Sequence, residues 1–426
     1  MNKFLSNPMR GMRDLLPSEV ELRQGAISII ESVYRQYGFT QIETPTVENI
    51  NLLTSNQGGE NEKQIFQIMK RGLKIEDVKN ISSFSELVDG GLRFDLTIPL
   101  VRYFSANQAV LPMPFKALQI GNVWRAERPQ KGRYRQFIQC DIDVIGDKSD
   151  FAEKELIVAT SEALLKLGFS GFKVRLNDRR ILRAIVEDCG CKETDFDMIY
   201  IIMDKLDKIG LEGIQKELTS KGVEAKPVKK IIDFLGNITG DAKKDDLFTI
   251  LPKDIDPAII QSLKDIMAFV QSQTECAYEI VFDPTLVRGM GYYTGPIFEI
   301  EDKDYPVSIA GGGRYDKMVG RYLGTDIPAC GFSIGFERIM SLLEKRGYKL
   351  PSQKEKKVLL FDPTGVDANT ALDIAQKLRK DGASICLQER RKNIKQQLTT
   401  LAGLGYNSFA IIQSESDKIN FKSFTR

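Results

Sequence analysis

Segment 133–146, with the sequence RYRQFIQCDIDVIG, constrains the fold of this chain more than any other segment. Side chains alternate between the two faces of a β-strand, so a strand here would have one apolar and one polar face. The mostly apolar face would hold Tyr134, Gln136, Ile138, Cys140, Ile142 and Val144. The polar face would hold Arg133, Arg135, Phe137, Gln139, Asp141 and Asp143. By itself this pattern fits a half-exposed strand whose polar face meets water as well as a strand that presents these groups to a ligand.

The residues just upstream favour a ligand-binding face. Segment 121–132, GNVWRAERPQKG, carries Arg125, Glu127, Arg128 and Lys131 and ends in a glycine. Together with the strand that follows, it predicts a hairpin. Its loop is rich in donors suited to phosphate oxygens.

Three further segments combine glycines with an arginine. In LVRGMGYYTG (286–295), Arg288 precedes two glycines and two tyrosines, and the glycines would let a ligand approach the backbone closely. SIAGGGRYDKMVG (308–320) has three consecutive glycines but neither the GxxxxGK[ST] nor the GxGxxG spacing, so it is a weak signal of a phosphate-binding loop. CGFSIGFERIM (330–340) predicts a strand that enters a helix carrying Arg338.

Changes of pattern along the chain predict four parts. Residues 1–177 alternate helical and strand-rich segments. Residues 178–277 have short helices, clustered lysines and polar turns, as expected of an inserted helical domain. Strand patterning returns at 278–346, and 347–426 begins with a polar linker and continues as a β-α-β-α-β series, which predicts a small α/β domain.

Local signals predict the ends of individual elements. Apolar spacing predicts a helix over 20–37, followed by a strand over 39–45. A second helix is predicted from Asp150 to Leu167, with Asp150 and Glu153 in an arrangement like a capping box.

The chain contains no histidine. This excludes an imidazole base, Ser/His/Asp and Cys/His mechanisms, and any metal site with histidine ligands. The six cysteines lack the CxxC…CxxC spacing of zinc sites, so we expect no resident metal. Proton transfer would fall to carboxylates, substrate or water, and chemistry that mainly stabilises charge becomes the natural candidate.

Composition also bears on location and partners. No apolar run is long enough to span a bilayer and the start does not resemble a secretory signal, so we expect a cytoplasmic protein without a membrane partner. The net charge is only +2, but from Lys354 onward thirteen Lys/Arg stand against eight Asp/Glu. This excess predicts a basic C-terminal part that contacts a polyanion.

Several motifs together resemble the class II aminoacyl-tRNA synthetases. These are GMRDLLP (11–17), GFTQIETPTVE (38–48), WRAERPQKGRYRQF (124–137) and GFSIGFERI (331–339). LVRGMGYYTG and AGGGRYD are similar to the two peptides of the histidine-specific family, the histidyl-tRNA synthetases. The resemblance covers nearly the whole chain. It implies an α+β fold with an antiparallel sheet flanked by helices, a helical insertion, and a C-terminal α/β domain like those that bind anticodons, apparently shortened.

The resemblance implies an ATP site. Arg125 and Arg288 would grip the α-phosphate from opposite sides and act as the catalytic cations. Adenine would lie between Phe137 and Arg338, a physically sensible stack of a ring under a cation. The remaining ATP-binding residues would be Glu127, near the adenine and ribose, and Arg133.

The resemblance also implies a histidine site. Asp95, with Thr97 nearby, would receive the α-ammonium group, and Gln139 would orient the backbone of the amino acid. Asp143 and Tyr293 would read the two imidazole nitrogens, one of which donates and one of which accepts a hydrogen bond. The other pocket residues implied are Tyr292, Gly311, Gly312 and Tyr315. Gln130 would lie near the acceptor end of the tRNA.

The implied activity is that of a histidine–tRNA ligase acting in two steps. Histidine attacks the α-phosphorus of Mg²⁺-bound ATP to give histidyl-adenylate and pyrophosphate, and the terminal hydroxyl of tRNA(His) then attacks the adenylate. Neither step needs a histidine side chain of the protein. The resemblance also implies a homodimer.

Two other functions share this resemblance. One is the synthetase-like regulatory subunit of ATP phosphoribosyltransferase, a non-catalytic relative, and the other is a non-catalytic tRNA-binding protein. The regulatory subunit typically loses residues of the ATP site and lacks the C-terminal domain. Arg125, Glu127, Arg288 and Arg338 are all present here and a C-terminal α/β domain follows, which favours the enzyme.

Overall fold

The computed structural model describes residues 6–54, 64–128, 133–239, 247–273, 275, 277–288, 292–348, 355–414 and 418–424. The chain forms two compact units, one made of Met1–Met12 and Ile27–Arg346 and the other of Arg13–Ala26 and Gly347–Arg426. Helix α1 (Pro17–Gln36) contributes residues to both. Within the described ranges, no helix is long and apolar enough to cross a membrane.

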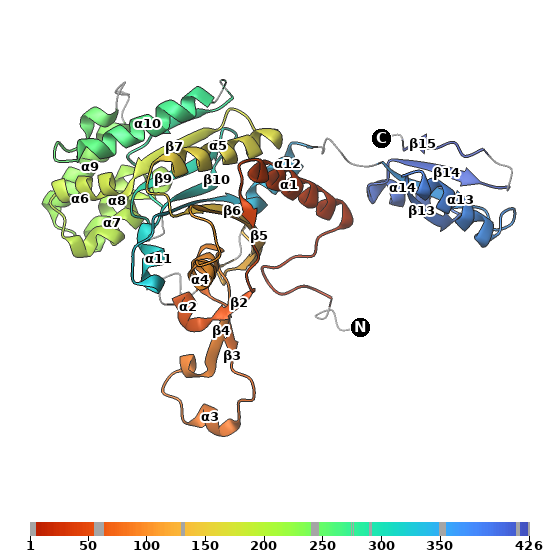
Figure 1. Ribbon diagram of the computed structural model, residues 1–426, viewed down its shortest axis with the longest axis horizontal. Coiled ribbons are helices and arrows are strands. Elements are labelled where there is room, and N and C mark those ends of the chain that lie inside the picture. The colour runs from red at the N-terminus through yellow and green to blue at the C-terminus, as the bar shows by residue number, and fades with distance from the viewer. Residues whose placement is uncertain are drawn as a thin grey trace. The chain divides into compact units, whose positions relative to one another are not determined.

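An eight-stranded sheet forms the centre of the first unit, in the order β1-β5-β6-β11-β10-β9-β7-β8 (Figure 1). Its strands are β1 (Thr40–Gln41), β5 (Phe115–Trp124), β6 (Gln136–Ile145), β7 (Lys173–Asp178), β8 (Glu279–Phe282), β9 (Pro296–Asp302), β10 (Tyr305–Arg314) and β11 (Ala329–Gly335). Neighbouring strands are antiparallel except for β1 with β5 and β7 with β8. This sheet and its flanking helices confirm the predicted α+β fold.

The strand predicted over 39–45 is much shorter than expected. Only Thr40–Gln41 pairs with β5, and the next amide, that of Ile42, donates to the Leu118 carbonyl at 3.0 Å. Further on, the carbonyl and the hydroxyl of Thr44 accept hydrogen bonds from the buried Arg93 guanidinium, at 2.7 and 3.1 Å. A side chain therefore satisfies the backbone there in place of a neighbouring strand.

Helices cover the sheet, as Figure 1 shows. They are α1, α4 (Thr97–Asn107), α5 (Phe151–Lys166), α11 (Asp316–Leu323) and α12 (Phe336–Lys345). The helix predicted from Asp150 is α5, but the capping box is wrong. Asp150 makes no cap hydrogen bond and pairs instead with Lys154 at 2.9 Å. Glu153 is buried and paired with Arg314 at 2.6 Å, so it does not reach back to the start of the helix.

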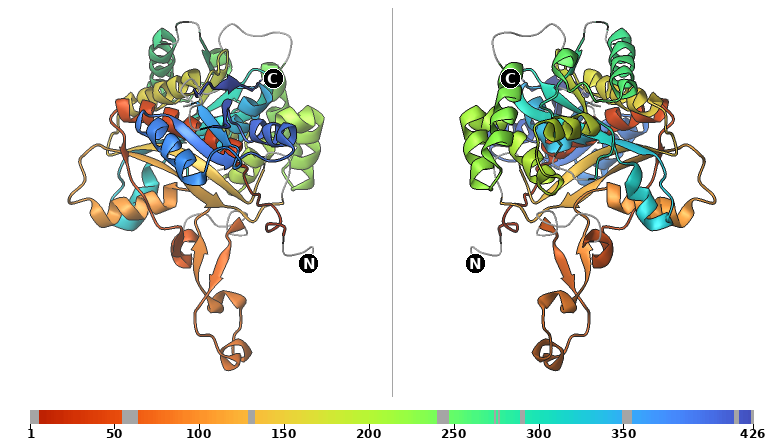
Figure 2. Two further views of the ribbon diagram at one scale, coloured as in Figure 1. Left: turned by 90° about the vertical axis from the view of Figure 1, so that its right-hand side faces the viewer. Right: turned by 90° about the vertical axis from the view of Figure 1, so that its left-hand side faces the viewer.

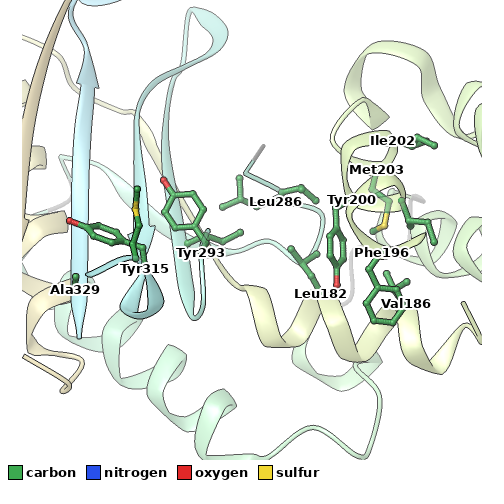
Figure 3. Packing of buried hydrophobic residues seen from close by; sticks show 14 of the residues in the cluster. Leu182, Val186, Phe196, Tyr200, Ile202, Met203, Leu286, Tyr293, Tyr315 and Ala329 are labelled. Atoms are coloured by element: carbon green, nitrogen blue, oxygen red, sulfur yellow. The ribbon is translucent and has the colours of Figure 1, made fainter. Parts of the chain in front are cut away.

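The predicted helical insertion lies between two neighbouring parallel strands. Strand β7 leads into α6 (Arg179–Asp188), α7 (Phe196–Met203), α8 (Leu206–Ser220), α9 (Ala225–Thr239) and α10 (Pro257–Gln273), and the chain returns as β8. One apolar cluster joins α6, α7, α8 and α9 to the central sheet. Figure 3 shows it running from Tyr315 and Tyr293, at the sheet, to Tyr200 and Phe196 in α7.

A small three-stranded sheet, in the order β2-β4-β3, extends from the first unit. Its elements are β2 (Val47–Asn49), α2 (Ile50–Thr54), β3 (Gln67–Met69), α3 (Ile75–Lys79), the 3₁₀ helix η3 (Phe84–Leu87) and β4 (Val88–Leu92). In both views of Figure 2 this extension points away from the eight-stranded sheet. Helix α3 has no buried residue.

The second unit contains a four-stranded sheet in the order β13-β12-β14-β15. Along the chain its elements are β12 (Lys356–Phe361), α13 (Ala368–Lys380), β13 (Ser384–Glu389), α14 (Ile394–Gly403), β14 (Ser408–Ile412) and β15 (Lys422–Ser423). This is the β-α-β-α-β series expected from the sequence, with one short strand added. Apolar clusters lie against both faces of β12, one including Leu359 and the other Val358 and Leu360.

Candidate active site on the central sheet

The polar face of β6 is buried at the base of the candidate site. Gln139, Asp141 and Asp143 are only 8%, 3% and 3% exposed. Across the antiparallel pairing with β11, Ser333 stands opposite Asp141 and Gly331 opposite Asp143. For these three residues the interpretation in which the face meets water is therefore wrong, because they are buried, whereas Arg133 at the start of the segment is exposed.

Asp95 and Gln139 each present one buried oxygen without a hydrogen-bond partner among the described residues: Asp95 Oδ2 and Gln139 Oε1. The other oxygen of Asp95 accepts from the Ile98 amide at 3.1 Å, at the start of α4, where Thr97 lies. The Gln139 amide nitrogen donates to Ser333 Oγ at 3.0 Å and lies within 3.4 Å of both Asp141 oxygens. Both orphaned atoms are acceptors, so this part of the site suits a ligand that donates hydrogen bonds.

Asp143 is held in place by Tyr315. The Tyr315 hydroxyl donates to Asp143 Oδ1 at 2.6 Å, and Tyr315 is only 2% exposed. A Cβ on Gly331 would lie 2.0 Å from the same oxygen, so glycine is required there for the carboxyl group to fit. Tyr292 packs beside two further tyrosines, with its ring centroid 4.8 Å from that of Tyr293 and 6.0 Å from that of Tyr315.

The acidic groups of the site hold protons more tightly than usual. Burial raises the pKa of Asp95 to about 6, although the Ile98 amide and Arg125 lower it. Burial raises the pKa of Asp143 to about 7, against the lowering effect of the Tyr315 hydroxyl. For Asp141, burial and the neighbouring Asp143 raise the pKa well above its ordinary value. A positively charged ligand would favour the ionised forms.

Arg125 lies at the start of the loop of the β5–β6 hairpin. Its amide donates to the Arg135 carbonyl at 2.8 Å, and its guanidinium donates to the Phe94 carbonyl at 3.0 Å, beside Asp95. The guanidinium also lies over the Phe137 ring, 5.1 Å from the centroid.

The other members of the hairpin lie near its loop. Glu127 Oε2 is 3.6 Å from Arg133 Nη1, and the Arg133 side chain is 54% exposed. Gln130 lies outside the described residues. The predicted hairpin is present, with Trp124 opposite Gln136 at its last pair.

Arg288 crosses the glycine-bearing strand β10. Its Nη1 donates to Glu299 Oε2 at 2.7 Å. A Cβ on Gly311 would lie 2.3 Å from the same nitrogen, so the guanidinium rests directly on the backbone of this glycine. Gly312 faces the other side, because a Cβ there would lie 2.0 Å from the Gly331 carbonyl oxygen and 2.8 Å from the Phe298 ring. Only the backbone of Gly312 is thus available to the site.

Arg338 lies in the first turn of α12, just after β11. Its Nη1 donates to the Ser308 carbonyl. Burial and the positive charge of Arg133 lower its pKa. Arg133 and Arg338 therefore lie close enough to repel each other, an arrangement that a polyanion between them would relieve.

Four residues of the site were not assigned a role from the sequence: Asp141, Glu299, Gly331 and Ser333. The alternation of segment 133–146 placed Asp141 on the correct face. Glu299, Gly331 and Ser333 reach the site through strand pairings between residues far apart in the chain. The sequence pattern carries no signal for such pairings.

The largely antiparallel eight-stranded sheet flanked by helices, with arginines and buried carboxyl groups at the candidate site, is consistent with one class of protein, the class II aminoacyl-tRNA synthetases. A family model described as "Histidyl-tRNA synthetase" matches residues 11–339, and the chain belongs to this family.

Individual relatives agree with the family model. A histidine–tRNA ligase from Leifsonia xyli subsp. xyli is 42% identical over 426 residues, which covers 97% of this chain and 96% of the relative. The crystal structure of histidyl-tRNA synthetase from Nostoc sp. PCC 7120 has a TM-score of 0.77 at 27% identity, covering 98% of this chain and 94% of that one.

A structure from Bacillus halodurans C, described as an ATP phosphoribosyltransferase regulatory subunit/histidyl-tRNA synthetase, has a TM-score of 0.75. It is 21% identical, covering 97% of this chain and 99% of that one. At this identity the similarity shows the shared fold alone.

Proposed function

We propose that this chain activates histidine with ATP and transfers it to tRNA(His). The observation that carries the proposal is the pair of orphaned acceptors, Asp95 Oδ2 and Gln139 Oε1, in a site that also contains Asp143. An α-ammonium group would donate to both acceptors. A buried polar atom left without a partner costs about 1–3 kcal/mol, so a ligand lacking that group would be disfavoured.

The aromatic end of the pocket suits an imidazole ring. Asp143 and Tyr293 would bind its two nitrogens, while Tyr292 and Tyr315 pack around them. Gly311 and the backbone of Gly312 would line the neighbouring strand. Because both ring nitrogens would have buried partners, an amino acid without them would leave those partners unsatisfied.

The arginines support the chemistry of activation. The histidine carboxylate would attack the α-phosphorus, the bond to the bridging oxygen of pyrophosphate would break, and charge would develop on the phosphoryl oxygens. Arg125 and Arg288, each fixed by a hydrogen bond to the protein, would stabilise that charge. Phe137 and Arg338 would hold adenine, while Glu127 and Arg133 would contact the rest of the nucleotide.

Other parts of the proposal concern cofactors, partners and location. Mg²⁺ would enter bound to the phosphates of ATP. Gln130 would contact the acceptor end of the tRNA, and the second unit would bind the anticodon region. We also propose a homodimer that acts in the cytoplasm.

Aminoacylation tests this proposal. The purified protein should charge tRNA(His) with radiolabelled histidine and should not charge it with other amino acids. Asp95→Asn, which replaces the orphaned carboxylate oxygen with an amide of similar shape, should raise the KM for histidine and leave the KM for ATP unchanged. Charging with a different amino acid, or none by a folded protein with cognate tRNA, would refute the assignment.

A further inference from the structure

The catalytic-site arginine Arg288 has a fixed protein partner whose role the activity does not yet explain. We infer that Glu299 is a positioning residue that fixes the Arg288 guanidinium over Gly311, in the orientation from which it meets the α-phosphate. The inference rests on the proposed function, because it assigns a role within the same reaction.

The first support is the geometry of strands β9 and β10. Glu299 on β9 stands directly opposite Gly311 on β10, so their Cα atoms are neighbours across the sheet. Arg288 fills the space above Gly311 that a side chain would occupy, and the Glu299 carboxylate reaches its Nη1 at 2.7 Å. Gly311 leaves room for the Arg288 guanidinium, and the Glu299 carboxylate fixes its position in that space.

The second support is that Glu299 is itself held by a neighbour. Arg175 stands opposite Glu299 on β7, and its Nη1 is 3.7 Å from Glu299 Oε1. Arg175 in turn donates to Asp283 Oδ2 at 2.6 Å, and the Thr285 hydroxyl donates to the other oxygen of Asp283 at 2.6 Å. The carboxylate therefore lies between two guanidinium groups and has little freedom to follow Arg288 if it moves.

Burial strengthens the hold of Glu299 on Arg288, because little water is present to screen the two charges. The side chains of Arg288, Glu299 and Arg175 are exposed by only 23%, 15% and 15%. A guanidinium on a long flexible side chain can adopt many conformations, and a buried bidentate or charge-assisted partner restricts them. Glu299 would touch neither ATP nor histidine in the proposed site, so it acts through Arg288.

The experiment measures histidine-dependent ATP–pyrophosphate exchange by the full chain with Glu299→Gln. We expect kcat to fall about 10-fold to 100-fold, since misplacing a catalytic group by about 1 Å costs on the order of 100-fold, with the KM for histidine unchanged. Glu301→Gln is the matched control. Glu301 lies two residues further along the same strand, and its ion pair among the described residues is a long one with Arg175, at 4.0 Å, so this variant should keep wild-type kinetics.

Chemical rescue separates positioning from general damage to the fold. In Arg288→Ala, millimolar guanidinium chloride should restore part of the missing exchange activity, because the free ion can occupy the space above Gly311 beside Glu299. Rescue should disappear when Glu299→Gln is added, and should persist with Glu301→Gln. Circular dichroism at the assay temperature checks folding; if Glu299→Gln does not fold, Glu299→Asp replaces it, and its shorter side chain should still lower kcat.

The possible outcomes distinguish this inference from the function on which it rests. If the wild type shows exchange and a folded Glu299 variant has a normal kcat, the positioning role is wrong. Equal rescue by guanidinium with and without the Glu299 carboxylate would also overturn it. Lack of histidine-dependent exchange in the wild type would instead refute the proposed function.

Discussion

Three carboxyl groups, Asp95, Asp141 and Asp143, share one buried site, and burial raises the pKa of each. Burying like charges close together is unfavourable unless a partner of opposite charge is present. Arg125 lowers the pKa of Asp95, but Asp143 and Asp95 raise the pKa of Asp141, and Asp95 raises that of Asp143. We infer that ionising these buried carboxyl groups lowers the stability of the free protein, and that a ligand with an ammonium group and a ring N–H binds more tightly because it compensates their charge.

The cost of ionising Asp143 predicts that Asp143→Asn stabilises the free protein in a pH-dependent way. The pKa of Asp143 is raised from its ordinary value to about 7 in the folded state, so its ionisation penalty is absent below pH about 4, grows between pH 4 and 7, and is complete above pH 7. The variant should increase the free energy of unfolding at pH 8 by about 4 kcal/mol, because a pKa difference of about three units corresponds to that energy, and change it little at pH 4. Urea denaturation at both pH values measures this, and equal effects at both would contradict it.

At the level of secondary-structure elements, β10 and β11 shape the site through glycines, which have no side chain. Gly311 leaves room for the Arg288 guanidinium, and Gly331 leaves room for the Asp143 carboxyl group. Gly312, between Gly311 and Gly313, serves the opposite face, where it lies against Phe298. Gly313 also has close neighbours, because a Cβ there would lie 2.7 Å from the Pro296 carbonyl oxygen and 2.9 Å from the Tyr293 ring. The three consecutive glycines thus fit close contacts around one strand, and they do not form a phosphate-binding loop.

Gly331→Ala should therefore act on histidine binding more than on ATP binding. Its Cβ would lie 2.0 Å from Asp143 Oδ1 and 3.2 Å from Tyr315 Cε1, forcing both away from the pocket. We expect the KM for histidine to rise about 10-fold to 100-fold, as for other small displacements of binding groups, with the KM for ATP unchanged. Gly403→Ala is the control, since a Cβ there meets nothing within 4 Å. An equal rise in both KM values would show general distortion instead.

The elements also show what can be predicted from sequence. The two-faced pattern of segment 133–146 predicted which side chains of β6 share the buried polar face, because alternation is a local property of a strand. The position of Glu299 beside Arg288 depends on the β9–β10 register, which the sequence pattern does not reveal. The extension with β2, β3 and β4 was also not predicted, since its strands are short and Gly90 and Gly91 interrupt the apolar pattern of β4.

At the scale of the whole molecule, the chain combines a catalytic unit with a second unit that contains a small α/β sheet. The basic surplus found in the sequence lies in this second unit, where Arg391, Lys392 and Lys395 are near the start of α14. Cations on one surface bind phosphates through release of counterions, and such binding weakens as salt rises. The motifs predicted the family, whereas the boundaries of the predicted domains and the binding surface of the second unit stay predictions.

Reversing two of these charges tests that prediction. Arg391→Glu combined with Lys395→Glu should weaken binding of tRNA(His) and reduce the slope of log Kd against log salt by about 2, one for each phosphate that the protein no longer neutralises. Histidine-dependent ATP–pyrophosphate exchange, which does not involve tRNA, should be unchanged. Filter binding at several salt concentrations measures the slope; an unchanged slope would place the tRNA surface elsewhere.

We propose that the buried site of the first unit activates histidine with the help of Arg288. ATP–pyrophosphate exchange by the purified chain with each amino acid in turn, alongside Arg288→Ala, measures this activity. We predict exchange with histidine alone and a decrease of about 100-fold or more in the variant, the size expected when a charge that stabilises a transition state is removed. A folded protein that shows no exchange with histidine would refute histidine activation, and an Arg288→Ala variant that retains full activity would refute the role of Arg288.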